Sequence, residues 1–308
     1  MPSRLPELGP APLLIGHRGA RAFAPENTLP AIERAAEFGC AMVEIDVHLS
    51  RDGVPVVHHD DTLRRCTDVA ERFPERADAW LSDFTLAELQ SLDAGSWYLR
   101  ELALPAAQRQ PFLRTLSDEE QALHLRPGHH AAFGGGRVRI PTLGEVLDAA
   151  RSLGLGVNVE IKSIPRMYPG IAARVLQDID RSGLRERVIV SSFDHEQLLA
   201  LRALDASLAL GVLVAERLAQ PERYLALLDA DAYHPGCNGE SDSLGFHSVA
   251  GTLETRGLDA VRASGRGVYV WTCNDAGQMR TLAAAGVSGI ITDYPNRFPF
   301  PRAATSRP

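Results

Sequence analysis

The chain has 308 residues, 45% hydrophobic and 23% charged, a composition typical of globular proteins with a large buried core. Its formal net charge of -7 excludes the broad basic surface that nucleic-acid binding requires. An anionic substrate would therefore have to be held by a few local basic side chains or by a metal ion. No apolar stretch approaches the ~20 residues of a membrane span, and the first residues lack the charged and apolar regions of a signal peptide.

The cysteines are widely spaced and form no C-x-x-C pair; they are Cys40, Cys66, Cys237 and Cys273. This spacing predicts reduced, packed thiols rather than a disulfide framework or a zinc site. We therefore expect the protein to reside in the cytoplasm.

Short apolar runs typical of strands alternate with segments of helical period along most of the chain, which predicts a parallel sheet built from βα units. The expected strands are Leu13–Gly16, Met42–Val47, Val157–Ile161, Val188–Ser192, Leu208–Val214, Ala230–His234, Gly267–Thr272 and Gly289–Thr292. Because about eight strands close a barrel, we expect an α/β fold of the (β/α)8 TIM-barrel type. The barrel domain would span residues 13–298, with loose tails at 1–12 and 299–308.

Capping residues mark several of the helices between these strands. Thr142 begins one helix, and Glu145 completes a capping box three residues later. Asp194 is expected to cap the helix after the fourth strand, and Asn274 or Asp275 the last helix.

One connection is far longer than a βα loop requires, the excursion between the second and third strands at about residues 63–140. It contains an expected helix at Leu86–Leu92 and then a stretch rich in Pro, Arg, His and Gly. We interpret it as a small inserted subdomain over the barrel mouth; a surface elaboration with no part in catalysis is the alternative. Trp97 and Tyr98 within it either line the mouth or anchor the insertion, and we favour the anchor.

Two strands carry carboxylates on a face that should be buried. Glu44 and Asp46 of the second strand point to one face because successive strand side chains alternate, and Asn158, Glu160 and Lys162 repeat the pattern in the third. Three buried carboxylates repel one another and lose hydration. A hard divalent cation, Mg²⁺ or Ca²⁺, is the simplest compensation. The alternative is a structural ion pair with Lys162, whose single charge cannot neutralise three carboxylates.

Histidines follow strands that should end near these carboxylates. His17 follows the first strand, where the active-site loops of a barrel begin, and His58 and His59 follow another apolar run. We interpret them as acid–base residues. Because adjacent side chains point in different directions, at most one of His58 and His59 should face the site, and the pattern leaves open which.

At these residues the sequence resembles the glycerophosphodiester phosphodiesterases. The matching motifs keep the family's order and cover nearly the whole chain: His17-Arg18-Gly19, Pro25-Glu26-Asn27-Thr28, Glu44-Ile45-Asp46-Val47, Asp52-Gly53, Val56-Val57-His58-His59-Asp60-Asp61-Thr62-Leu63, Ile140-Pro141-Thr142-Leu143, Val159-Glu160-Ile161-Lys162, Ser191-Ser192-Phe193, Trp271-Thr272-Cys273-Asn274 and Thr292-Asp293-Tyr294-Pro295. The resemblance implies a (β/α)8 barrel with a small insertion between the second and third barrel strands. It also implies metal-dependent hydrolysis of glycerophosphodiesters to sn-glycerol 3-phosphate and an alcohol.

The resemblance further implies roles for single residues. His17 and His59 match the family's catalytic general acid/base pair, and Glu44, Asp46 and Glu160 match the ligands of one divalent cation, Mg²⁺ or Ca²⁺.

Other matched positions concern the substrate. Arg18 and Lys162 match groups that hold the phosphate, Asn27 lies beside them, and Trp271 matches an aromatic residue near the glycerol. The stretch Arg100–Arg137 has no match in the family, so the size of the substrate and the leaving group are not implied.

Several alternatives stay open. A lysophospholipase D-type phosphodiesterase would need an apolar channel or a membrane-facing surface. Lys162 could form a Schiff base in an aldolase-type lyase, and a non-catalytic phosphodiester-binding barrel is a third class. Within the favoured reaction the nucleophile could be water or the substrate's own 2-hydroxyl. The expected partner is a small glycerophosphodiester, with no nucleic acid and no stable membrane insertion, and the oligomeric state is not indicated.

Overall fold

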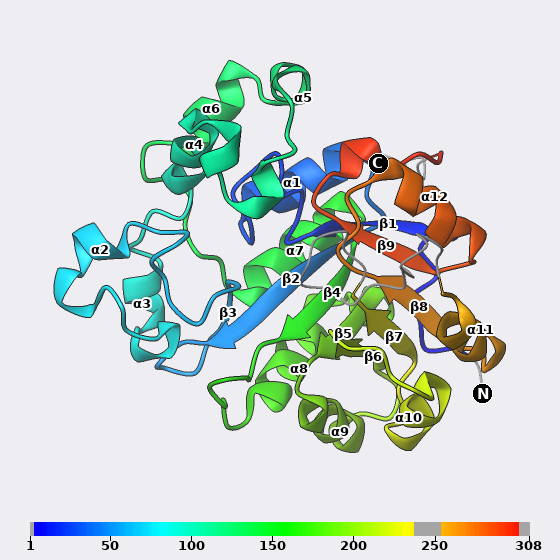
Figure 1. The fold of residues 1–308 in the computed structure, drawn as a ribbon. Coiled ribbons are helices and arrows are strands. Elements are labelled where there is room, and N and C mark those ends of the chain that lie inside the picture. The colour runs from blue at the N-terminus through cyan, green and yellow to red at the C-terminus, as the bar shows by residue number, and fades with distance from the viewer. Residues whose placement is uncertain (1–2, 237–253, 302–308) are drawn as a thin grey trace.

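The structure is a computed structural model and describes residues 3–236 and 254–301. Eight parallel strands close into a barrel (Figure 1): β1 (Leu13–His17), β2 (Met42–Leu49), β4 (Gly156–Ile161), β5 (Val188–Ser192), β6 (Ala209–Val214), β7 (Ala232–Pro235), β8 (Gly267–Val270) and β9 (Gly289–Thr292). They are hydrogen-bonded in this order, and the pairing of β9 with β1 closes the ring. The predicted TIM barrel is confirmed.

Helices surround the barrel and cover the outward side chains of the strands (Figure 1): α1 (Leu29–Glu37), α7 (Leu143–Leu153), α8 (Ile171–Ser182), α9 (His195–Leu204), α10 (Pro221–Leu227), α11 (Arg256–Ala263) and α12 (Ala276–Ala284). The caps predicted for α7, α9 and α12 form where the sequence places them. Thr142, Asp194 and Asp275 each accept a hydrogen bond from a backbone N–H in the first turn of the following helix. Each cap satisfies a backbone donor that the helix itself leaves unpaired.

A short ninth strand, β3 (Pro55–Val57), pairs antiparallel with the end of β2. It lies outside the parallel barrel and was not among the expected strands. Because β3 ends at Val57, it sets the starting point of the loop that carries His58 and His59.

The segment before β1 differs from the loose tail that we expected. Leu5 and Leu8 pack against the apolar residues inside the barrel. Arg4 forms ion pairs with Asp229 at 2.8 Å and with Asp231 at 3.1 Å. Residues 3–12 therefore cover one end of the barrel interior, opposite to the ends of the strands that carry the site.

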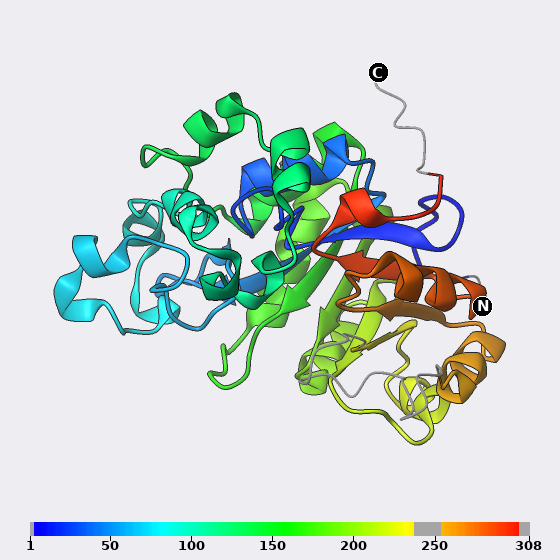
Figure 2. The ribbon, with the colours of Figure 1, turned by 45° about the horizontal axis from the view of Figure 1, so that its top comes forward.

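The insertion between β2 and β4 forms a group of short helices to one side of the barrel (Figures 1 and 2): α2 (Val69–Arg72), η1 (Pro74–Arg76), η2 (Leu81–Asp83), α3 (Leu86–Leu89), α4 (Ser96–Ala103), η3 (Ala106–Gln108), η4 (Pro111–Leu113), α5 (Asp118–His124) and α6 (Pro127–Phe133). Trp97 and Tyr98 are buried, and the Tyr98 hydroxyl donates a hydrogen bond to the Ala22 carbonyl at 2.7 Å. This agrees with the anchoring interpretation, because Tyr98 ties the insertion to the loop after β1.

Two further expectations concern the whole chain. Cys40, Cys66 and Cys273 are buried and outside any disulfide of the described residues, whereas Cys237 lies beyond them. Of the helices that the structure describes, none has the length and apolar character to cross a bilayer.

Candidate active site

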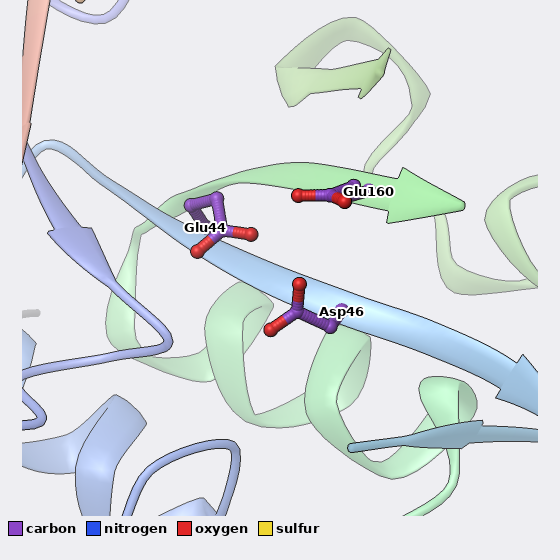
Figure 3. A group of neighbouring side chains, drawn as sticks. All are labelled: Glu44, Asp46 and Glu160. Atoms are coloured by element: carbon purple, nitrogen blue, oxygen red, sulfur yellow. The ribbon is translucent and has the colours of Figure 1, made fainter. Parts of the chain in front are cut away.

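Strands β1, β2 and β4 are neighbours in the barrel, and this adjacency assembles the predicted carboxylates. The register places His17 opposite Glu44 and Asp46 opposite Glu160. The carboxylates of Glu44 and Asp46 from β2 and of Glu160 from β4 converge (Figure 3), with one oxygen of each within 4.8 Å of the others. All three side chains are buried.

Basic groups compensate only part of this negative charge. Lys162 Nζ lies 2.5 Å from Glu160 Oε1 and 3.1 Å from Asp46 Oδ1, and Arg18 Nε lies 3.3 Å from Asp46 Oδ2. Burial alone would raise the pKa of Asp46, but Lys162, followed by His59 and then Arg18, lowers it well below its usual range. Burial and the neighbouring carboxylates raise the pKa of Glu44 well above its usual value.

Glu44 is the acidic residue that these cations leave least compensated. Its Oε2 accepts a hydrogen bond from the Arg18 backbone N–H at 2.9 Å, whereas its buried Oε1 has no hydrogen-bond partner among the described residues. The structure thus contains the ion pair with Lys162 that was the alternative to a metal site. It also leaves one carboxylate oxygen without a partner among the described residues, as a metal site would. A set of oxygen donors from three carboxylates with an orphaned oxygen fits a hard divalent cation.

The loop after β1 places two polar side chains against Asp46 by means of unusual backbone angles. Arg18 and Asn27 have φ of 52° and 56°, in the left-handed region that non-glycine residues rarely adopt. The Asn27 amide donates a hydrogen bond to Asp46 Oδ2 at 2.8 Å, and Arg18 Nη1 donates one to Glu26 Oε1 at 2.8 Å. Strained residues of this kind cluster at functional sites, where surrounding contacts hold them in place.

His17 is held by a carboxylate from the far end of the chain. Its Nδ1 lies 2.7 Å from Asp293 Oδ1, and its Nε2 lies 3.8 Å from Glu44 Oε2. Because Arg21 and His17 lower the pKa of Asp293 against the effect of burial, this carboxylate is ionised and His17 Nδ1 must donate. Nε2 therefore presents its lone pair toward the carboxylates. Burial, reinforced by Arg21, lowers the pKa of His17 to about 4, so the ring is neutral at pH 7.

His59, like His17, is bound through Nδ1 to a carboxylate. Its Nδ1 donates a hydrogen bond to Asp60 Oδ1 at 2.7 Å, and Arg65 in turn binds Asp60. Burial and the Arg18 charge lower the pKa of His59 to about 3. His58 points elsewhere, since its Nε2 donates to the Thr62 carbonyl.

These groups surround a cavity of about 230 Å³ at the carboxyl ends of the strands. All of the predicted site residues line it except Asp46 and Asn27, which lie behind the others. The lining residues are His17, Arg18, Arg21, Glu44, His59, Asn158, Glu160, Lys162, Phe193, Leu213, Trp271, Thr272 and Ile291.

Trp271 forms part of the apolar wall of this cavity. Its ring packs edge-on against Phe193, with centroids 5.5 Å apart, and its Nε1 donates to the His234 carbonyl at 2.8 Å. The cavity thus has one apolar wall beside a strongly charged one.

Sequence reasoning assigned no role to several groups that the structure places in contact with the site. Asp293 and Asp60 directly follow the last strand and His59, and both lie within the matched motifs, so their position offered a signal. Arg21 and Arg65 lie in loops without any periodicity, and no pattern pointed to them.

The fold and the site together define a class of enzyme. A (β/α)8 barrel has at its carboxyl end a buried carboxylate trio, cations fit to bind an anion, and two histidines, each backed by a carboxylate. This combination is suited to hydrolysis of a phosphate ester assisted by a metal ion.

Comparison with known proteins identifies the family. The sequence model of the glycerophosphoryl diester phosphodiesterase family matches residues 17–297. A glycerophosphodiester phosphodiesterase of Caldanaerobacter subterraneus is 31% identical over 92% of this chain and 94% of its own, and one of Bacillus altitudinis is 29% identical over 92% and 95%. The structure of an Oleispira antarctica phosphodiesterase in complex with the product sn-glycerol-3-phosphate shares 27% identity, with a TM-score of 0.69 over 93% of this chain and 94% of that one. The chain belongs to the glycerophosphoryl diester phosphodiesterase family, which confirms the predicted family and enzyme class.

Proposed function

We propose that the protein hydrolyses glycerophosphodiesters to sn-glycerol 3-phosphate and an alcohol, with the help of one divalent cation and a pair of histidines. The observation that carries the proposal is the convergence of Glu44, Asp46 and Glu160 beside two carboxylate-backed histidines at one cavity. The names of the relatives and the product bound to the Oleispira antarctica enzyme support the same substrate class.

Glu44, Asp46 and Glu160 are the residues that would hold the cation, Mg²⁺ or Ca²⁺. When bound there, such a cation would polarise a phosphoryl oxygen and stabilise negative charge in the transition state. The unsatisfied Glu44 Oε1 supports this assignment, since a buried carboxylate oxygen without a partner is costly in the absence of a ligand.

Arg18 and Lys162 are suited to holding the phosphate. Both line the cavity, and carboxylate neighbours outweigh burial and raise the pKa of each side chain, so both stay charged. Arg18 offers a planar fork of donors and Lys162 a compact charge. Both therefore present positive charge at the cavity in which the substrate phosphate would bind.

His17 and His59 would divide the proton transfers. Both rings are neutral at pH 7, and both are oriented through Nδ1 by a carboxylate that also stabilises the protonated ring. One, in this neutral form, would remove a proton from the nucleophile. The other would first have to take up a proton on Nε2, in the charged form that its carboxylate partner stabilises, and would then give this proton to the departing alcohol, since an alkoxide leaves poorly.

The apolar wall of Trp271 and Phe193 would take the carbon skeleton of the glycerol. The nucleophile is water or the glycerol 2-hydroxyl, and a substrate that lacks this hydroxyl separates the two routes. Normal turnover of that analogue would exclude an obligatory cyclic phosphate.

The alternatives fare differently against the geometry. An aldolase needs a neutral lysine, whereas the ion pairs of Lys162 with Asp46 and Glu160 keep its amine protonated despite burial. Lysophospholipid hydrolysis keeps the same site and stays the second candidate. The cytoplasmic location stays a prediction.

The test measures release of glycerol 3-phosphate from glycerophosphocholine by metal-stripped protein, before and after addition of Mg²⁺ or Ca²⁺. We expect release only after addition, and little release from a Glu44→Gln variant at the same metal concentration. Full activity of the stripped protein would refute the metal requirement. A folded, metal-loaded protein without activity would refute the substrate.

A further inference from the structure

A second cavity lies directly beside the proposed active site. It has a volume of about 390 Å³, larger than the cavity of about 230 Å³ that holds the carboxylates. Arg21 and Thr272 line both cavities, and Asp293, which orients His17, lines the second. The two cavities are therefore neighbours that share the Arg21 and Thr272 side chains in their walls.

The insertion supplies one wall of the second cavity, through Phe112 and Thr115. Arg297 fixes this wall by donating a hydrogen bond to the Thr115 carbonyl at 2.7 Å, and the Arg21 guanidinium stacks on the Phe112 ring at 4.2 Å. The Tyr294 hydroxyl also donates to the Phe112 carbonyl. The part of the insertion around Phe112 and Thr115 is thus bound firmly to the barrel mouth.

The first cavity is too small to enclose a whole glycerophosphodiester. Sites that enclose a whole small molecule usually have volumes of about 300–1,000 Å³, and about 230 Å³ falls below this range. Phosphate beside Arg18 and Lys162, with glycerol against Trp271, would use the first cavity. The alcohol on the other side of the phosphate then needs separate space.

The charges around the second cavity restrict what it can bind. Its two arginines are already paired, Arg21 with Asp293 and Arg297 with Glu120. Asp275 is exposed at its edge and has no ion-pair partner among the residues that the structure describes. Although the charge of Asp275 also acts on Arg297, the two arginines lie among three carboxylates, Asp293, Glu120 and Asp275. The net charge around the cavity is therefore negative, which attracts a cation and repels an anion.

We propose that this second cavity binds the alcohol half of the substrate and, through Asp275, favours amino alcohols that carry a positive charge over alcohols that carry a carboxylate. The proposal rests on the proposed function and names the leaving group that the enzyme prefers. It also assigns a role to the insertion, whose Phe112 and Thr115 help to enclose the leaving group.

The test compares kcat/KM for three diesters that share the glycerol 3-phosphate half, with Mg²⁺ or Ca²⁺ present. Their alcohols are ethanolamine, serine and methanol, so the first is cationic, the second adds a carboxylate and the third is too small to reach the second cavity. We expect the wild-type protein to favour the ethanolamine diester over the serine diester.

Two variants change the second cavity but leave the carboxylates and histidines of the proposed active site as they are. Asp275→Asn keeps an N-cap for α12 but removes the charge, and we expect the ethanolamine-to-methyl ratio of kcat/KM to fall by about two- to fivefold, as for loss of an exposed ion pair. Thr115→Trp fills the cavity, and we expect the same ratio to fall at least tenfold. Asp259→Asn, an exposed carboxylate of α11 away from both cavities, is the control and should leave the ratio unchanged.

The outcomes separate this proposal from the proposed function. Unchanged ratios in both cavity variants, with the methyl ester still hydrolysed, would overturn the leaving-group assignment alone. A wild-type protein that hydrolyses none of the three diesters would refute the proposed function instead. Melting temperatures of both variants show whether a loss reflects unfolding, and Asp275→Asn keeps the test decisive if Thr115→Trp does not fold.

Discussion

Asp293 should determine which nitrogen of His17 carries the proton. It accepts hydrogen bonds from His17 Nδ1 and Asn274 Nδ2, both at 2.7 Å, and it pairs with Arg21. In Asp293→Asn an amide N–H can face Nδ1, which favours the tautomer with its proton on Nε2, the nitrogen 3.8 Å from Glu44. Loss of the correct tautomer in a carboxylate–histidine pair costs about 10³- to 10⁴-fold in kcat, or about 4–5.5 kcal/mol of activation free energy.

We expect this loss in kcat with KM nearly unchanged, measured on glycerophosphocholine with added metal. The free energy of unfolding should fall by only about 1–3 kcal/mol, because Arg21 keeps Glu26 at 3.7 Å and the Phe112 ring. A urea titration followed by circular dichroism separates the two effects, and Asp259→Asn serves as the control. If folded Asp293→Asn retains kcat within tenfold of the wild type, or loses activity only through KM, then Asp293 does not set the tautomer.

Three further predictions concern the histidines and the chain before β1. His17→Ala and His59→Ala should each abolish turnover while metal binding, measured by calorimetry, survives; near-normal activity in either variant would remove its assigned role. His234 is buried, neither of its ring nitrogens has a hydrogen-bond partner within residues 3–236 and 254–301, and burial lowers its pKa to about 3. The unfolded ring takes up a proton below about pH 6.5, so the free energy of unfolding falls as the pH drops from there toward 3. His234→Leu should reduce this fall between pH 7 and 5 by about 2 kcal/mol. Urea midpoints that change with pH equally in the wild type and the variant would contradict this. Leu5→Ala and Leu8→Ala should each lower the free energy of unfolding by about 1–2 kcal/mol, whereas no change would show that the segment does not stabilise the barrel.

The strands of the barrel could be predicted because each is a short run of apolar residues between polar turns, and helix caps such as Thr142 mark the segments between them. β3 has only three residues, and the sequence showed it as a short apolar run before His58 but did not reveal its antiparallel pairing with β2. The packing of Leu5 and Leu8 was equally hidden, because prolines interrupt the periodicity there and their partners lie in distant strands.

The carboxylates of the site were predictable for a different reason. Strand geometry alone places Glu44 and Asp46 on one face, and their chemistry conflicts with burial there. Arg21 and Asp293 showed no such conflict between charge and expected burial, because charged residues are common in loops. They meet only because the barrel closes β9 onto β1 and so brings together residues 272 positions apart in the sequence.

The distribution of charge explains why such a site is retained although it opposes stability. Lys162 is shared between Asp46 and Glu160, and Arg18 between Glu26 and Asp46, so neither cation forms an ion pair with Glu44 as well. A sequence selected for stability alone would replace Glu44 by an apolar side chain, because an uncompensated buried carboxylate costs free energy and a packed apolar residue does not. Keeping it makes sense where a ligand completes the site, as binding of a cation to the folded state alone would return that free energy. The unsatisfied oxygen of Glu44 is therefore a sign of function rather than a defect of packing.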